Sequence, residues 1–215
     1  REHRVFCVET PHTADMNVHC LTRGAEEFTA NVFLLEGDRT ALIDAGAMRG
    51  ITDAVKEHVK QLDALVITHQ HNDHIARLEE VVTAFDPTVY ALAEHSMRTE
   101  PLADGMTLEL GDESFEVVHS PGHAPDHVSL VSTRTLISGD VVVYNDGAFD
   151  DGSFGRTDMA GQSRGRLVES LERLLTVMGE DVERLYAGHG SSFSGDVMQV
   201  VERALRRARR DEPKY

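Results

Sequence analysis

Residues 68–74 constrain this chain more than any other segment. They read Thr-His-Gln-His-Asn-Asp-His and follow the apolar run Leu65-Val66-Ile67, which predicts a buried strand ending in a polar loop. The loop carries four side chains of the kinds that bind zinc, iron or manganese: His69, His71, Asp73 and His74. In an extended loop, the first two face one side and the last two turn toward another. This arrangement favours two neighbouring metal ions over one.

Chance clustering is the alternative interpretation, because the chain contains 12 histidines. Three later segments argue against it. Each ends an apolar run with a glycine beside a potential ligand: Gly122-His123, Gly139-Asp140 and Gly188-His189. Glycine is favoured where backbone must turn tightly or approach another group closely. The repeated pattern therefore predicts that several strand ends meet at one site.

These motifs resemble the metallo-β-lactamase-fold superfamily, whose hallmark is His-x-His-x-Asp-His, and the resemblance covers nearly the whole chain. It implies that His69, His71 and His123 hold one metal, that Asp73, His74 and His189 hold a second, and that Asp140 bridges both. The implied cofactors are two divalent metal ions, with Zn²⁺ favoured and iron or manganese as alternatives.

The resemblance also implies an α/β fold, the αββα sandwich of two mixed β-sheets flanked by helices. We expect a single domain over residues 1–215, because no repeat or linker divides the chain. Hydrophobic spacing predicts helices at 51–61, 74–85, 167–178 and 197–209. Apolar and alternating runs predict strands at 31–36, 40–44, 65–68, 89–92, 107–110, 114–119, 128–132, 135–137 and 184–187.

The composition is strongly acidic, with 37 acidic and 21 basic residues and a formal net charge of −16. This balance disfavours nucleic acid as a partner. Arginine supplies most of the positive charge, and an acidic, lysine-poor surface suggests a high-salt habitat; an ordinary acidic enzyme is the alternative. The arginines at 203–210 are interpreted as the solvated face of a helix.

No segment is apolar enough to span a bilayer, and the N-terminus shows no export signal, so we expect a cytoplasmic protein without a membrane partner. Cys7 and Cys20 fit no zinc spacing and are expected to be ordinary reduced thiols. The sequence does not indicate an oligomeric state.

Four further residues are candidates for supporting roles. Asp44 is either a turn former or, as the resemblance implies, a partner that orients a ligand histidine. Thr68 is expected to position the ligand loop. His127 is expected to be packed and hydrogen-bonded and not to coordinate metal. Arg156 is either a binding group for a substrate carboxylate or half of a salt bridge with Asp158.

Two metals sharing a carboxylate can hold a water as hydroxide and polarise the bond under attack, which predicts hydrolysis. Asp73 is then also the expected catalytic proton acceptor. Residues 152–161 resemble a stretch of small glyoxalase II-like hydrolases, whereas Asp140 stands where main-subclass β-lactamases carry cysteine. The leading hypothesis is therefore hydrolysis of a small-molecule ester or thioester, such as a hydroxyacyl thioester.

Other functions stay open. The same metals suit a phosphodiesterase or a ribonuclease of the tRNA 3′-processing type, although Ile75-Ala76-Arg77 follows His74 where those nucleases commonly have glycine. A non-haem iron persulfide dioxygenase would need only one metal, and a non-enzymatic binding module is the last alternative. Only one predicted helix follows His189, so we do not expect the longer helical C-terminal domain with which full-length glyoxalase II binds glutathione, and the thiol carrier stays open.

Overall fold

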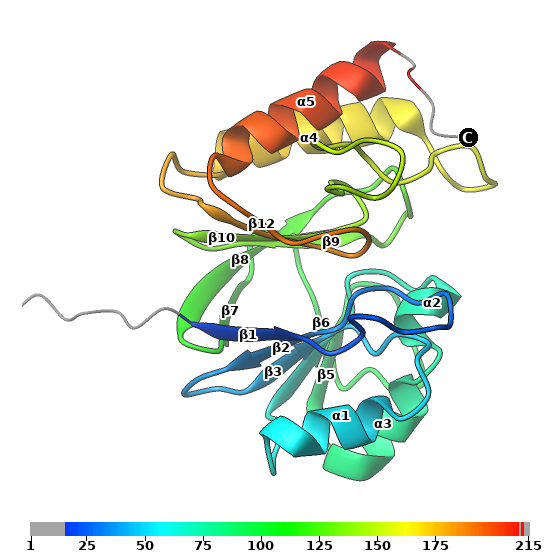
Figure 1. The fold of residues 1–215 in the computed structure, drawn as a ribbon, viewed down its shortest axis with the longest axis vertical. Helices are drawn as coiled ribbons and strands as arrows, with labels where there is room; N and C mark the ends of the chain where they lie inside the picture. The colour runs from blue at the N-terminus through cyan, green and yellow to red at the C-terminus, as the bar shows by residue number, and fades with distance from the viewer. Residues whose placement is uncertain (1–15, 211, 213–215) are drawn as a thin grey trace, which may run out of the picture.

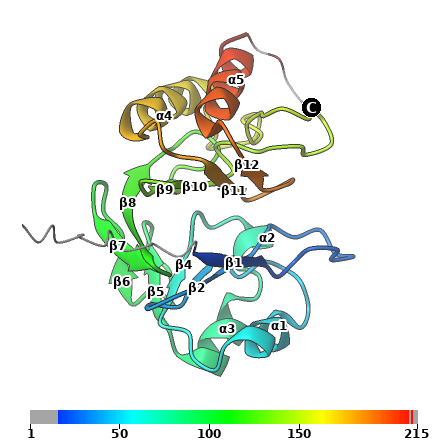
Figure 2. The same ribbon diagram turned by 60° about the vertical axis from the view of Figure 1, so that its left-hand side comes forward.

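The computed structural model describes residues 16–210 and Glu212, and these residues form two six-stranded sheets with helices on their outer faces (Figures 1 and 2). The N-terminal sheet has the order β1 (Asn17–Cys20), β2 (Phe33–Glu36), β3 (Ala41–Ile43), β4 (Ala64–Val66), β5 (Thr88–Ala91) and β6 (Glu100–Pro101). The C-terminal sheet has the order β12 (Phe193–Ser194), β11 (Arg184–Ala187), β10 (Thr135–Gly139), β9 (Val128–Val131), β8 (Glu113–His119) and β7 (Thr107–Leu110).

The helices are α1 (Ile51–His58), α2 (Asn72–Ile75), α3 (Leu78–Phe85), α4 (Arg164–Val177) and α5 (Val197–Arg210). Helices α1 and α3 cover the outer face of the N-terminal sheet, and α4 and α5 cover that of the C-terminal sheet (Figure 1). Both sheets are mixed: β3 to β6 pair in parallel, as do β10 and β11, while the other pairs are antiparallel. The prediction of an αββα sandwich is confirmed.

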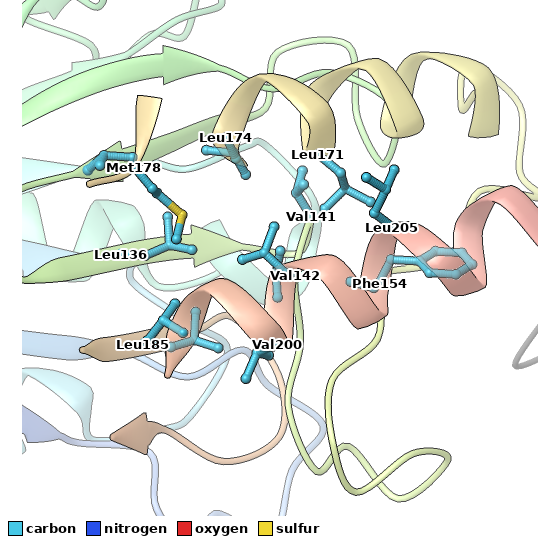
Figure 3. Packing of buried hydrophobic residues seen from close by; sticks show 14 of the residues in the cluster. Leu136, Val141, Val142, Phe154, Leu171, Leu174, Met178, Leu185, Val200 and Leu205 are labelled. Atoms are coloured by element: carbon cyan, nitrogen blue, oxygen red, sulfur yellow. The ribbon is translucent and has the colours of Figure 1, made fainter. Parts of the chain in front are cut away.

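Three layers of buried side chains hold the sheets and helices together. Alternation along β2 separates two of them, because Phe33 packs between the sheets and Leu34 packs toward α1 and α3. The third layer joins the C-terminal sheet to α4 and α5 through residues such as Leu171 and Val200 (Figure 3). The apolar stripe of α5 faces this layer, so its arginines face outward.

The outward arginines form ion pairs with nearby acids. Arg206 contacts Glu202 at 3.5 Å and Arg209 contacts Glu172 at 2.6 Å. These contacts fit the interpretation of a solvated helix face. In the part of the chain that the structure describes, no helix is long and apolar enough to cross a membrane.

The prediction of one helix over residues 74–85 is wrong. The structure contains α2 and α3, separated at Ala76 and Arg77. The carbonyl of His74 accepts hydrogen bonds from the N–H groups of Ala45 and Gly46, both at 2.8 Å, and Arg77 N–H donates to Gly46. Because a neighbouring loop takes these backbone groups, a continuous helical ladder does not form through this point.

Three short strands, β1, β6 and β12, were not expected from the sequence. Each has two to four residues, and all three lie at sheet edges, where pairing depends on the neighbouring strand more than on an apolar pattern. Cys20 is a free, partly buried cysteine, whereas Cys7 lies outside the described residues. The assignment of residues 1–215 to a single domain stays a prediction.

Candidate metal centre

Loops that follow strands of both sheets bring the seven predicted ligands to one place. The loop after β4 supplies His69, His71, Asp73 and His74; the loops after β8, β10 and β11 supply His123, Asp140 and His189. Parallel strands end at the same sheet edge, which explains how ligands far apart in sequence meet. Residues of both halves of the chain therefore line the same site.

The first group consists of three imidazoles. His71 Nδ1 lies 3.0 Å from His69 Nε2 and 2.9 Å from His123 Nε2. Nitrogens coordinated at about 2.0–2.1 Å around a tetrahedral ion are separated by roughly 3.3 Å. The three nitrogens thus lie close to the spacing that one ion requires.

The second group combines a carboxylate with two imidazoles. Asp73 Oδ2 lies 3.0 Å from His189 Nε2 and 3.9 Å from His74 Nε2. Asp140 lies between the two groups. Its Oδ2 is 3.3 Å from His123 Nε2 and 3.4 Å from His189 Nε2, and its Oδ1 is 3.4 Å from His74 Nε2. One carboxylate therefore reaches both groups.

Two of these potential ligand atoms are buried without a hydrogen-bond partner. His74 Nε2 and Asp140 Oδ1 are buried and have no hydrogen-bond partner. Burying such atoms without a partner is costly, and natural proteins rarely do so. Coordination of divalent ions would satisfy both atoms, so the residues present fit the two metals that the sequence predicted.

Asp44 fixes the orientation of His74. Its Oδ2 accepts hydrogen bonds from His74 Nδ1 at 2.7 Å and from the Thr68 hydroxyl at 2.8 Å, while its Oδ1 accepts from Thr68 N–H at 2.8 Å. With Nδ1 engaged, the Nε2 atom of His74 faces the site. This is the support expected of a residue behind a metal ligand.

His127 supports Asp140 from behind. Its Nε2 accepts a hydrogen bond from Asp140 N–H at 2.9 Å, so the ring is neutral and carries its proton on Nδ1. Nδ1 donates to Ser120 Oγ at 2.9 Å, and the chain continues through Ser129 Oγ to the carbonyl of Ser138. His127 is fully buried and belongs to none of the ligand groups found among the described residues.

Two glycines allow the close approach of these groups. A Cβ on Gly188 would lie 2.2 Å from Asp140 Oδ1, and one on Gly139 would lie 2.4 Å from His127 Nε2. Gly139 also adopts a positive φ of 50° at the irregularity where β10 pairs with β11. Glycine at these positions is a steric requirement of the site.

Burial and charge shift the pKa values in opposite directions. Burial lowers the pKa values of His69 and His127 well below their ordinary range, with further lowering from neighbouring imidazoles. Burial opposes ionisation of Asp140, but the charges of His74 and His189 outweigh it and hold its pKa well below the usual value. Burial also opposes ionisation of Asp73, but the hydrogen bond from His189 together with the charges of His74 and His189 lowers its pKa below the usual value. Both carboxylates are therefore ionised at neutral pH.

The site opens into a cleft of about 750 Å³. Phe28, which is 79% exposed, stacks on the His189 ring with centroids 5.4 Å apart, and Met159 lies at the same rim. Arg156 also lines the cleft, and its guanidinium forms two hydrogen bonds with Asp158 at 2.9 and 3.0 Å. The salt bridge considered from the sequence is thus present.

Sequence reasoning missed Asn31 and Phe28. The Asn31 side chain donates to the carbonyls of Ala187 and Gly190, at 2.9 and 3.0 Å, and so fixes the loop that carries His189. No local pattern marks a contact across so many residues. Phe28 had one recognisable feature, since it is an aromatic residue within an otherwise polar stretch.

Several curated proteins are similar to part of this chain. A hydroxyacylglutathione hydrolase from Aliivibrio fischeri is 37% identical over 105 residues, which cover 47% of this chain and 41% of that protein. Hydroxyacylglutathione hydrolase 2 from Vibrio vulnificus is 36% identical over 108 residues, which cover 48% of this chain and 42% of that protein. The chain thus spans less than half the length of these relatives.

Solved structures share the fold over more of the chain. TTHA1623, described in a di-iron-bound form, has a TM-score of 0.65 at 27% identity and covers 81% of this chain and 93% of its own. ETHE1 from Myxococcus xanthus has a TM-score of 0.67 at 21% identity, with coverage of 84% and 80%. The family model of the metallo-beta-lactamase superfamily matches residues 25–189. The chain belongs to the metallo-β-lactamase superfamily.

Proposed function

We propose that this protein is a metal-dependent hydrolase that cleaves a small ester or thioester. The observation that carries the proposal is the position of Asp140, whose carboxylate lies between two complete ligand groups at the base of an open cleft. The similarity to hydroxyacylglutathione hydrolases supports a thioester substrate.

His69, His71 and His123 would hold one divalent ion, and Asp73, His74 and His189 the other, with Asp140 shared between them. Bound ions of this kind lower the pKa of water toward neutrality and polarise the carbonyl under attack. Zn²⁺ suits the donor set, and iron or manganese suits it as well. The di-iron form described for TTHA1623 supports iron as the alternative.

Asp73 is the proposed catalytic proton acceptor. Its carboxylate is ionised at neutral pH and faces the cleft beside His189, so it can take the proton that an attacking water loses. Asp44 and His127 hold His74 and Asp140 in place. The exposed ring of Phe28 and the exposed side chain of Met159 offer an apolar surface to the acyl or thiol part of the substrate.

The cleft disfavours the nuclease alternative. Besides Asp73 and Asp140, its lining contains Glu27 and Asp146, and Arg156 is already paired with Asp158. Such a lining repels a phosphodiester backbone, whereas a small carbonyl substrate does not need a cationic groove.

The experiment combines metal analysis with a substrate panel. Wild-type protein, Asp140→Ala, His189→Ala and a control, His95→Ala, are analysed for bound metal by mass spectrometry. We expect the Asp140 variant to contain two fewer ions per chain than wild type, the His189 variant to lose mainly one, and the His95 variant to be unchanged. The wild-type enzyme should release thiol from a hydroxyacyl thioester.

The same panel tests the alternatives. Efficient cleavage of bis-p-nitrophenyl phosphate or RNA without thioester hydrolysis would replace the proposal with a phosphodiesterase. Oxygen consumption with a persulfide, in protein that is fully active with one iron at the centre, would replace it with a dioxygenase.

A further inference from the structure

A second group of metal-ligand side chains lies away from the metal centre. It consists of His19 in β1, Glu36 at the end of β2 and His58 at the end of α1. The metal centre lies at the C-terminal ends of the parallel strands β3 to β5. Glu36 precedes the turn into β3 and so lies at the opposite end of that strand. Helix α1 follows β3 and runs back toward that opposite end. The group is therefore at the opposite end of the N-terminal sheet.

Strand alternation and the helix end bring the three side chains together. His19 is opposite Leu34 in the β1–β2 register, and Leu34 packs toward α1. Glu36 is two residues beyond Leu34, so it points to the same face of the sheet. His58 lies in the last turn of α1, which covers this face.

The donor atoms converge closely. Glu36 Oε1 lies 3.0 Å from His19 Nε2 and 3.6 Å from His58 Nδ1, and the three atoms all lie within 4.8 Å of one another. These separations bracket the roughly 3.3 Å expected between ligands of a tetrahedral ion. The two imidazole rings are 4.0 Å apart.

Two details favour coordination over a simple ion pair. His19 Nε2 is buried but makes no hydrogen bond of acceptable geometry, although Glu36 Oε1 is within 3.0 Å. Asn17 Nδ2 donates to the other carboxylate oxygen, Oε2, at 3.0 Å. Asn17 thereby orients Oε1 toward the histidines, as outer partners of metal ligands do.

We propose that His19, Glu36 and His58 bind a divalent transition-metal ion of the Zn²⁺ type, separate from the metal centre. Two imidazoles and one carboxylate suit zinc, nickel or copper and do not suit Mg²⁺, which prefers oxygen ligands. The side chains remain about 30% exposed (29%, 29% and 31%), so water can occupy a fourth position. The ion would tie the edge strand β1 to α1 and act on stability, not on turnover.

The test compares metal content and thermal stability. Wild-type holoprotein, with its centre filled, is compared with His58→Ala, Glu36→Gln and the matched control Glu57→Gln, which alters an exposed neighbour on α1. Zn²⁺ is then titrated during thermal melts. At a hundredfold excess over the dissociation constant, site occupancy should raise the Tm of wild type and of the control by about 5–10 °C.

We expect His58→Ala and Glu36→Gln to hold one ion fewer than wild type and to lose this Tm increase, with kcat/KM for the thioester unchanged. Mg²⁺ should produce no difference between the four proteins. Equal metal content in all four, or an equal Zn²⁺-dependent Tm increase, would overturn the proposal. Because the readouts are metal content and Tm, the result does not depend on which substrate the enzyme cleaves.

Discussion

At the scale of single residues, the metal centre depends on side chains that touch no substrate. Asp44 orients His74, and His127 holds the backbone of Asp140. Asp73 differs from them because it faces the cleft and is only partly buried. Substitutions at these positions should therefore separate loss of chemistry from loss of structure.

Replacing Asp73, which is both the proposed proton acceptor and a proposed ligand of the second metal, should lower turnover without unfolding the protein. We expect Asp73→Asn to lower kcat by about 10²–10⁴-fold, the usual contribution of a general base, with a Tm close to that of wild type. Steady-state kinetics and thermal melts check this, with the exposed Asp53→Asn as control. A variant that retains more than half of the wild-type kcat would show that Asp73 is not the acceptor.

His127 should make stability depend on pH. Burial lowers its pKa, so the folded protein keeps it neutral while an unfolded chain protonates it below about pH 6.5. Its contribution to the free energy of unfolding is therefore fully present above that pH and is lost as the pH falls toward the folded pKa. The loss approaches about 1.4 kcal/mol per pH unit for one group.

Denaturant titrations from pH 7.5 to 5 on metal-free protein measure this dependence. We expect His127→Gln to be less stable than wild type at pH 7.5, by about 1–3 kcal/mol because buried partners lose hydrogen bonds. Its stability should then fall less steeply with acid. Parallel curves for the two proteins would mean that His127 does not titrate on unfolding.

At the scale of elements, the site is built from strand ends and tight loops. The loop after β11 passes so close to Asp140 that only glycine fits at position 188. We expect Gly188→Ala to displace the Asp140 carboxylate and to weaken metal binding by about 10–100-fold, the range seen when support of a ligand is lost. Metal-competition titration with a chromophoric chelator measures the affinity.

Gly179→Ala is the matched control, because nothing lies within 4 Å of its added Cβ. It should bind metal as tightly as wild type. Comparable weakening in both variants would point to a general effect of the extra methyl group and would contradict the steric argument.

Local patterns predicted the ligand loops well, because each motif sits directly after an apolar strand. They identified seven residues that the structure brings together, and they identified the helix at 197–210 from its apolar stripe. They failed where distant backbone competes for hydrogen bonds, as at His74, whose carbonyl is taken by the loop at Ala45. Asn31 was missed for the same reason, since its partners lie more than 150 residues away.

At the scale of the whole molecule, a net charge of −16 acts on stability. The arginines in exposed ion pairs such as Arg173–Asp104 and Arg209–Glu172 are already counted in this net charge, and each such pair contributes little to stability. Mutual repulsion among the remaining acids disfavours the compact state, and salt screens it. This balance makes the high-salt habitat suggested by the sequence testable.

We expect the Tm of the holoprotein to rise steadily as KCl increases from 0.05 to about 2 M, because screening of like charges outweighs the loss of surface pairs. Differential scanning calorimetry measures the curve, with sucrose of equal osmolality as control. A Tm that falls with KCl would indicate that attractive pairs dominate the surface and would remove the argument for a high-salt habitat.

Each of the two ions proposed for the metal centre takes ligands from both halves of the chain: His69, His71, Asp73 and His74 come from the first, and His123, Asp140 and His189 from the second. Neither half alone supplies the full ligand set of the centre. Metal binding and the packing of the two halves against each other are therefore thermodynamically coupled. Chelation should weaken the contact between the two sheets before it destabilises either sheet. The ions proposed for catalysis would thus also hold the two halves of the molecule together.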